Sequence, residues 1–400
     1  MYNLNCCSAL QLAFLLIVAN WGCNCLAQDG ERSKSAKRIG GPFENSEYLY
    51  YGMPAKLNST DTSPGWSVNG QKLIVSGTMY KRDGKTPAPG VILYYYHTDL
   101  NGLYVDGPGL DSRALRHGYI RGWVKSDANG AYTIRTVRPA PYPKESIPAH
   151  IHLAVKEPDL NEYYIDDLVF DDDKLLTSDL RKKMENRGGS GVLRLLESGD
   201  TRIAEHDLIL GMNVPDYPVA ASRKEQSGLQ IGDEFPSFIP FHAWGPDRGS
   251  RACPVCKYGR YQGVVYVVGK SPNWSSIKDW LKFLEEESTA REKTLKVFFV
   301  YGNKEGYKAD VRRVELESIG KELGLFNIAL TYVPSLGDSE TEVHLLKIEP
   351  AQESIFFIYR QRAIVDKFIN LAPTEENFSR IRASLDRTKG KYQELKSPHD

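Results

Sequence analysis

The chain has 400 residues, of which 41% are hydrophobic, and its 51 basic residues balance its 51 acidic residues. This length favours two domains, and the apolar content is sufficient for packed cores. A net charge of zero, without a long run of one sign, argues against nucleic acid or an anionic membrane as the main partner.

The first 27 residues differ in character from the rest of the chain. The apolar run SALQLAFLLIVANWG is short for a membrane span, and it ends in CLA, where Cys25 and Ala27 are the small residues of a cleavage site. Residues 1–27 are therefore predicted to be a signal peptide. The mature protein is expected to be secreted or periplasmic and to have no transmembrane segment, with a lipid-anchored form as the alternative.

Residues 28–70 are polar and rich in Gly, Ser, Asn and Pro, so we expect a loosely ordered N-terminal arm or cap. Residues 71–215 contain short β-type runs, among them QKLIVSGTMY, GVILYYYHT and GAYTIRTV, separated by turn signals. Little of this half has a helical period, which predicts an antiparallel β-sandwich. Residues 216–230 carry Pro, Ser, Gly and charge and are the expected linker.

Residues 231–395 follow a different pattern and predict an α/β domain. GVVYVVG and LKVFFVYG are nearly continuous apolar runs, which are typical of buried parallel strands. Between them SSIKDWLKFLEEE has apolar residues at helical spacing, with Ser275 or Ser276 as the expected N-cap. DVRRVELESIGKELG predicts a second helix, and ESIFFIYRQRAIVDKF predicts a hairpin.

The strand-like stretch AHIHLAV carries His150 and His152. Residues i and i+2 of a strand point to the same face, so the two imidazoles can bind one metal ion. For an isolated H-x-H pattern, ordinary polar strand residues are the commoner explanation. Two tyrosines change this balance, because Tyr104 follows a turn at Gly102 and Tyr142 lies eight residues before His150.

Together, YYYHTDLNGLY, PAPY and PAHIH resemble the motifs of the intradiol ring-cleavage dioxygenases, the family of catechol and protocatechuate dioxygenases. The resemblance covers residues 72–213. It implies a non-haem Fe(III) held by Tyr104, Tyr142, His150 and His152. It further implies a catechol-type aromatic substrate and O2, with cleavage between the two hydroxylated carbons and Tyr142 as the displaced ligand that accepts a substrate proton.

The same ligand set is chemically sensible without the family. Phenolate is a hard anionic oxygen donor, and two phenolates favour Fe(III) over Fe(II) and over softer metals. The charge of the ion in turn favours the ionised form of each phenol.

The sequence departs from the family pattern at Ile147. Active members carry an arginine at this position, three residues before the first histidine, where it is thought to stabilise charge on the substrate. An isoleucine offers neither a hydrogen bond nor a charge. Arg138 is the expected replacement in a catalytic role, with Arg121 and Lys144 as other candidate cations.

The mature chain keeps only two cysteines, Cys253 and Cys256, in the sequence CPVC. This motif, and IGDEFPSF at residues 231–238, resemble thioredoxin-like proteins, in which Pro350 would be the cis-proline. In that family the CxxC motif follows the first core strand, whereas here it precedes GVVYVVG. A local structural disulfide is therefore favoured over a redox pair.

Three functional alternatives stay open at this stage. A zinc site at the CPVC motif would recruit His242 or His344. A non-catalytic, transthyretin-like or ligand-binding β-sandwich could be fused to a thioredoxin-like thiol-disulfide domain. The leading hypothesis is an Fe(III) dioxygenase of aromatic compound catabolism, and the sequence leaves the substrate and a homo-oligomeric state open.

Overall fold

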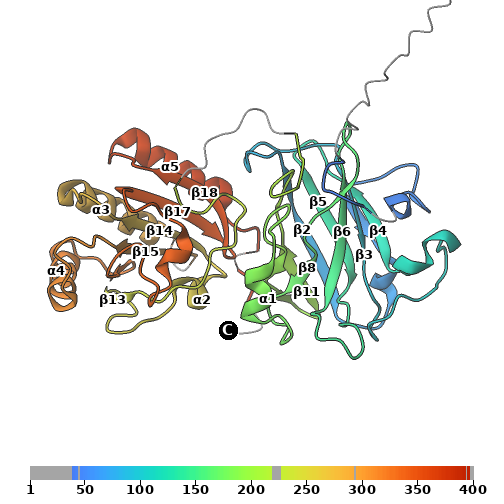
Figure 1. Ribbon diagram of the computed structural model, residues 1–400, viewed down its shortest axis with the longest axis horizontal. Helices are drawn as coiled ribbons and strands as arrows, with labels where there is room; N and C mark the ends of the chain where they lie inside the picture. Colours follow the sequence, from blue (N-terminus) through green and yellow to red (C-terminus); the bar gives the residue numbers. More distant parts are fainter. Residues whose placement is uncertain (1–37, 44–45, 219–226, 292–293, 393, 397–400) are drawn as a thin grey trace, which may run out of the picture. The chain divides into compact units, whose positions relative to one another are not determined.

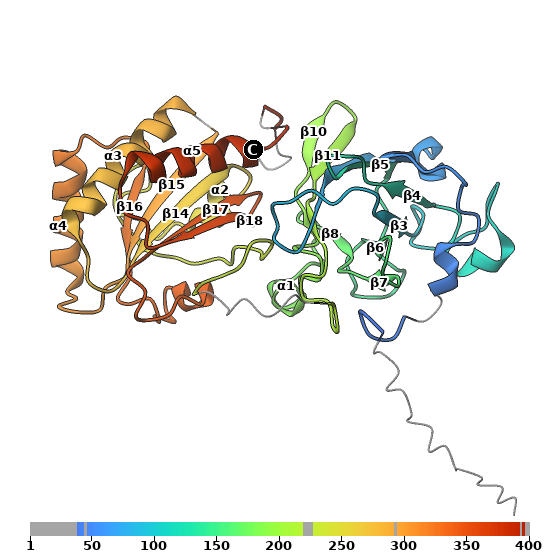
Figure 2. The same cartoon turned by 90° about the horizontal axis from the view of Figure 1, so that it is seen from above.

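The structure is a computed structural model that describes residues 38–43, 46–218, 227–291, 294–392 and 394–396 (Figures 1 and 2). The predicted signal peptide and its lipid-anchored alternative lie outside these residues. Within the described part of the chain, no helix combines the length and the apolar character needed to cross a membrane.

The N-terminal half contains two sheets. In the first, the order of the strands is β1 (Thr60–Thr62), β5 (Ala131–Val137), β2 (Lys72–Tyr80), β11 (Thr201–Glu205) and β10 (Leu196–Ser198), and β12 (Leu208–Ile209) also pairs with β2. In the second, it is β4 (Arg121–Lys125), β3 (Ile92–Tyr96), β6 (His150–Lys156), β8 (Leu168–Phe170) and β9 (Val192–Leu193), with β7 (Tyr163–Tyr164) beside β6. The short helices η3 (Ser112–His117) and α1 (Ser178–Lys183) lie in the connections.

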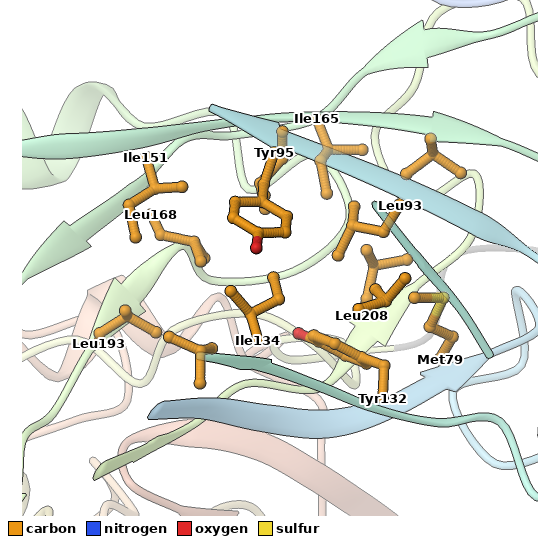
Figure 3. Packing of buried hydrophobic residues seen from close by; sticks show 14 of the residues in the cluster. Met79, Leu93, Tyr95, Tyr132, Ile134, Ile151, Ile165, Leu168, Leu193 and Leu208 are labelled. Atoms are coloured by element: carbon orange, nitrogen blue, oxygen red, sulfur yellow. The ribbon is translucent and has the colours of Figure 1, made fainter. Parts of the chain in front are cut away.

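The inner faces of the two sheets form one hydrophobic core (Figure 3). Leu93 and Tyr95 of β3 meet Tyr132 and Ile134 of β5 there, because alternate residues of a strand point to the same side. The pairing is mixed rather than wholly antiparallel as predicted, since β1, β9 and two partners of β2 run parallel to their neighbours.

Residues 46–70 are part of this fold rather than a loosely ordered arm. They form η1 (Ser46–Leu49), β1 and η2 (Pro64–Ser67), and β1 pairs with β5. The Ser63 hydroxyl caps η2 and lies 2.7 Å from the hydroxyl of Thr136. The polar composition did not predict this packing, which combines such hydrogen bonds with the burial of Leu49.

The C-terminal half contains a third sheet. Its order is β13 (Phe241–Trp244), β16 (Ala329–Tyr332), β15 (Leu295–Tyr301), β14 (Gln262–Val268), β17 (Ser354–Arg360) and β18 (Ala363–Ile369). The described helices of this half are α2 (Pro254–Tyr258), α3 (Trp274–Ala290), α4 (Ala309–Glu322), η4 (Val343–Leu346) and α5 (Glu375–Thr388).

Strand β14 shows why the strands of this half have nearly continuous apolar sequences: both of its faces are buried. Val264 and Tyr266 pack in one core with Trp280 of α3, while Val265 and Val267 pack in a second core on the other face. β14 and β15 are parallel, and β17 and β18 form the predicted antiparallel hairpin. The N-cap of α3 is Asn273 rather than a serine, because its side chain accepts the hydrogen bond of the Ser276 amide.

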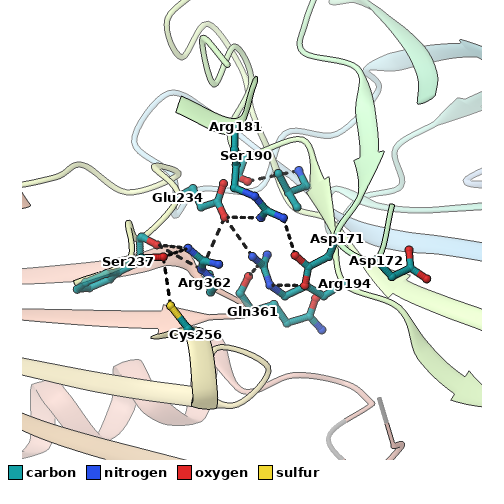
Figure 4. A network of polar contacts seen from close by, with 12 residues as sticks. Asp171, Asp172, Arg181, Ser190, Arg194, Glu234, Ser237, Cys256, Gln361 and Arg362 are labelled. Carbon is teal, nitrogen blue, oxygen red and sulfur yellow. Dashed lines mark hydrogen bonds and ion pairs between the residues drawn. The ribbon is translucent and has the colours of Figure 1, made fainter. Parts of the chain in front are cut away.

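A network of charged side chains surrounds Glu234 (Figure 4). Its carboxylate pairs with Arg181 and Arg194 at 3.1 Å each, and Arg181 also bonds Asp171 at 2.8 Å. Removal of one partner from a buried pair of this kind is costly, because the other charge is left without compensation. These contacts join the segment after the linker to residues of the sandwich.

Stability is expected to fall in mild acid, because His206 is buried beside Tyr132. Burial lowers the pKa of His206 to about 4, so the unfolded chain binds the extra proton between about pH 6.5 and pH 4. The contribution is present above pH 6.5 and is lost as the pH falls, by about 3 kcal/mol in total. Denaturant titrations should show a smaller loss of stability between pH 7 and pH 4.5 in His206→Gln than in the wild type.

His344→Gln, a substitution at an exposed histidine, is the control. Equal pH dependence of the wild type and His206→Gln would contradict the assignment.

Candidate metal centre

The two histidines lie on the face of strand β6 that is turned away from the core. Ile151, Leu153 and Val155 point into the sandwich, whereas His150 and His152 lie on the opposite face of the sheet. The outer face of β3 continues this surface, because Tyr96 is the register partner of His152. The strand spacing thus brings the two imidazoles together, as the sequence predicts.

The two tyrosines are brought together by two turns that bind each other. Ala140 donates its backbone N–H to the carbonyl of Asp99, and the hydroxyl of Thr98 donates to the carbonyl of Ala140. Gly102 has a φ of +77°, and a Cβ at this position would lie 2.0 Å from the carbonyl oxygen of Pro141. Only a glycine permits this close approach, which places Tyr104 beside the turn that carries the second tyrosine.

Four donor atoms converge at this point. The hydroxyl oxygens of Tyr104 and Tyr142 lie 2.6 Å apart, and the two histidine Nε2 atoms lie 3.2 Å apart. His152 Nε2 is 2.9 Å from the Tyr104 hydroxyl, and His150 Nε2 is 3.2 Å from the Tyr142 hydroxyl. The structure thus brings together all four residues that the sequence predicts as metal ligands.

The hydrogen bonds of the histidines leave both Nε2 atoms available. His150 Nδ1 lies 2.7 Å from the Pro148 carbonyl, and His152 Nδ1 lies 3.0 Å from a carboxylate oxygen of Asp167. Both partners can only accept, so each Nδ1 donates a proton to its partner, and in the neutral tautomer the lone pair of Nε2 points toward the other donors. Burial lowers the pKa of His150, which also favours the neutral ring.

The phenols need a nearby positive charge in order to ionise. Burial raises the pKa of Tyr104 and of Tyr142 above the ordinary value for a tyrosine. Two facing imidazole lone pairs and two phenol oxygens form a site that a metal cation would complete, since ligands on bonds of about 2 Å lie about 3 Å apart. The donor set fits a hard, highly charged ion.

Asp167 is a further acidic residue at this site. His150, His152 and Asp167 form the one group of three or more potential His, Cys, Asp or Glu ligands found within the described residues. Two histidines and a carboxylate are typical of Fe(II) sites, but here the carboxylate is hydrogen-bonded to Nδ1, on the far side of the ring from the other donors. We therefore assign Asp167 to the orientation of His152.

Aromatic stacking fixes the same ring from another side. The Tyr96 ring lies 4.6 Å from that of His152 and 3.7 Å from that of His117, and Tyr94 is hydrogen-bonded to His117. Burial lowers the pKa of His117 to about 3, so this histidine is neutral. Sequence reasoning missed His117 and Asp167, since neither lies in a motif with the ligands.

The N-terminal segment covers this aromatic cluster. Arg121 donates to the backbone carbonyls of Tyr48 and Tyr51, and the indole N–H of Trp123 donates to the carbonyl of Leu49 at 2.7 Å. Arg121 is therefore occupied in holding this segment. Its side chain is buried against aromatic rings rather than directed at the donor atoms.

The other candidate cations are also accounted for. Arg138 forms two hydrogen bonds with Asp172, at 2.7 and 2.8 Å, so a carboxylate already offsets its charge. This pairing gives no support to the predicted role of Arg138 beside the substrate. Lys144 is exposed, and Ile147 is 44% exposed in the same loop.

Cys253 and Cys256 form a disulfide in the structure. Cys253 is the N-cap of α2, and Cys256 is exposed with its Sγ 3.2 Å from the hydroxyl oxygen of Ser237 (Figure 4). Helix α2 precedes β14, and the loop after β14 contains no cysteine, as the sequence indicated. The bond occupies both sulfurs, which argues against the zinc alternative.

Comparison with known proteins agrees with this geometry. Residues 48–202 match the protein-family model described as Dioxygenase. This part of the chain is similar to dioxygenases. It includes all four converging donors and begins inside the segment that composition alone assigned to an arm. Over 121 residues the chain is 30% identical to the catechol 1,2-dioxygenase of Acinetobacter baylyi. The alignment covers 26% of this chain and 38% of that relative.

Solved dioxygenase structures are also similar to part of this chain. The dioxygenase domain of a carbohydrate-binding fusion protein from Streptomyces sp. SirexAA-E is 23% identical, with a TM-score of 0.28, covering 40% of this chain and 94% of that chain. The mercury-inhibited catechol 1,2-dioxygenase from Acinetobacter sp. ADP1 is 21% identical, with a TM-score of 0.32, covering 47% of this chain and 67% of that chain.

Replacement of both cysteines by serine should lower stability only slightly. A disulfide that closes so short a loop constrains little of the unfolded chain, so the loss should lie at the low end of about 0–5 kcal/mol. Metal content should not change, because neither sulfur contacts the donor residues. Thermal unfolding and metal analysis of the double variant test this, and rapid turnover of the disulfide by a thioredoxin-type reductant would favour a redox role instead.

Proposed function

We propose that this protein is a non-haem Fe(III) dioxygenase that cleaves a catechol-type aromatic ring between its two hydroxylated carbons. The observation that carries the proposal is the convergence of two phenol oxygens and two imidazole Nε2 atoms, of which five pairs lie 2.6–3.3 Å apart. The match of residues 48–202 to the Dioxygenase family model and the similarity to a catechol 1,2-dioxygenase support it.

Each donor residue has a distinct role in this proposal. His150 and His152 hold the ion as neutral ligands, and Tyr104 holds it as a phenolate. A ferric ion, when bound, would supply the charge that attracts a catecholate and the chemistry that activates the ring toward O2. Tyr142 is the ligand that gives way to substrate, and its Oη accepts one of the catechol protons.

Ring cleavage needs a cation that offsets the negative charge developing on the substrate, and the candidate side chains supply it poorly. Ile147 cannot offset negative charge that develops on the substrate, and Arg138 is paired with Asp172. This observation favours the second candidate, a ligand-binding sandwich that holds an aromatic without cleaving it. The two candidates differ in whether a bound catechol is converted.

We further propose that the chain works outside the cytoplasm and that residues 231–395 are thioredoxin-like. A disulfide persists in an oxidising compartment, which agrees with the predicted signal peptide. The order β15-β14-β17-β18, with β17 antiparallel to β14, supports the thioredoxin-like assignment. The Cys253–Cys256 disulfide is then structural.

The purified protein should contain about one iron per chain and absorb visible light through tyrosinate-to-Fe(III) charge transfer. His150→Ala and His152→Ala should each remove the iron and the colour, because three ligands bind far more weakly than four. His344→Ala is the control and should keep both. Colourless, iron-free protein from iron-replete cells would contradict the proposal.

Ring opening of simple catechol should be slow in the wild type. Loss of a single electrostatic donor typically costs on the order of 10²–10³ in rate. Ile147→Arg should therefore speed cleavage, measured as the appearance of the ring-opened product, whereas the uncharged control Ile147→Gln should not. If the wild type already cleaves catechol at typical enzyme rates, another cation acts, and comparison of Arg138→Ala with Lys144→Ala identifies it.

A further inference from the structure

The fixed charge in contact with the donor set is negative. A carboxylate oxygen of Asp167 lies 3.0 Å from His152 Nδ1, and the potential ligand atoms of His150, His152 and Asp167 lie within 4.8 Å of one another. The side chain of Asp167 is 38% exposed, so its charge also faces molecules that enter from solvent.

A second carboxylate lies in the loop between the ligands. Glu145 is exposed and follows Tyr142 by three residues. The backbone N–H of Glu145 donates to the carbonyl of Tyr142 at 3.4 Å, so this carboxylate belongs to the same turn as the tyrosine.

The cationic side chains nearby contact other groups than the donors. Arg121 donates to backbone carbonyls and lies over the rings of Tyr94 and Trp123, and Arg138 is bound by Asp172. Lys144 is exposed beside Glu145 and offsets it in part, which leaves Asp167 as the charge that touches a donor residue. Ile147, where the resembling family carries a cation, is apolar and 44% exposed.

We propose that the substrate of this site is a catechol that carries a positively charged amine on a short alkyl arm, an inference that rests on the proposed ring-cleavage function. A ferric ion with two phenolates would carry a net charge of +1. A catecholate dianion that replaces the Tyr142 phenolate, which leaves as a neutral phenol, would bring this charge to 0. The negative charge of Asp167 then dominates beside the donors, so a carboxylate on the substrate is repelled and an ammonium group is attracted. The ammonium takes the place of the missing side-chain cation, and Ile147 offers an apolar contact to the alkyl arm.

The test uses three catechols of nearly equal shape: 4-(2-aminoethyl)catechol, neutral 4-propylcatechol and anionic 3-(3,4-dihydroxyphenyl)propionate. Each is titrated into the iron-loaded full chain without O2, and the shift of the charge-transfer band gives its dissociation constant. The amine should bind about tenfold more tightly than the neutral catechol, and the carboxylate more weakly than either. Added salt should reduce the difference, because the site is partly exposed.

Substitutions at the exposed residue Ile147 test the effect of a side-chain charge on the preference for the amine. Ile147→Arg should abolish or reverse the preference for the amine, whereas Ile147→Gln should retain it. Asp159→Asn, an exposed acid beyond the far end of β6, is the control and should behave as the wild type. If the neutral catechol shifts the band but the three ligands bind equally, or the anion binds most tightly, the amine assignment is overturned and the proposed function stands. If no catechol shifts the band, the proposed function itself fails.

Discussion

The alternation of side chains along β6 is the constraint on which the site depends. Ile151 and Leu153 are anchored in the sandwich core, so His150 and His152 must face the other way. A shift of one residue in register would bury both histidines and expose the core residues, which makes the register hard to change. The stability of the core and the placement of the ligands are therefore two results of one strand.

The remainder of the site is built outward from that strand in layers. The stacked rings of Tyr96 and His117 support the imidazole of His152, and the segment around Leu49 closes over those rings. The turns that carry Tyr104 and Tyr142 bind each other through backbone hydrogen bonds, so neither tyrosine is placed by a flexible loop alone. Such support is what a metal site requires, because donor positions must be held before the ion binds.

The sequence was sufficient for the features that are encoded locally. Strand alternation predicted that His150 and His152 share a face, and the resemblance to the intradiol dioxygenase motifs implied that two tyrosines join them. Asp167 and His117 could not be predicted, because they reach the site through sheet pairing and packing between distant segments. The same holds for residues 46–70, whose polar composition suggests a loose arm although Ser63, Leu49 and the strand β1 bind them to the sandwich. The charge of the site also depends on such distant contacts, since Asp172 determines what Arg138 can do.

The central claim is that one iron ion is bound by two tyrosines and two histidines on the outer face of the sheet. Anomalous diffraction from crystals of the full chain, recorded on both sides of the iron absorption edge, tests this claim most directly. The account predicts one iron peak among the Tyr104 and Tyr142 hydroxyl oxygens and the Nε2 atoms of His150 and His152, with Asp167 hydrogen-bonded to His152 rather than to the ion. A peak coordinated by Asp167 in place of the tyrosines, or the absence of iron from this position in iron-replete protein, would contradict it.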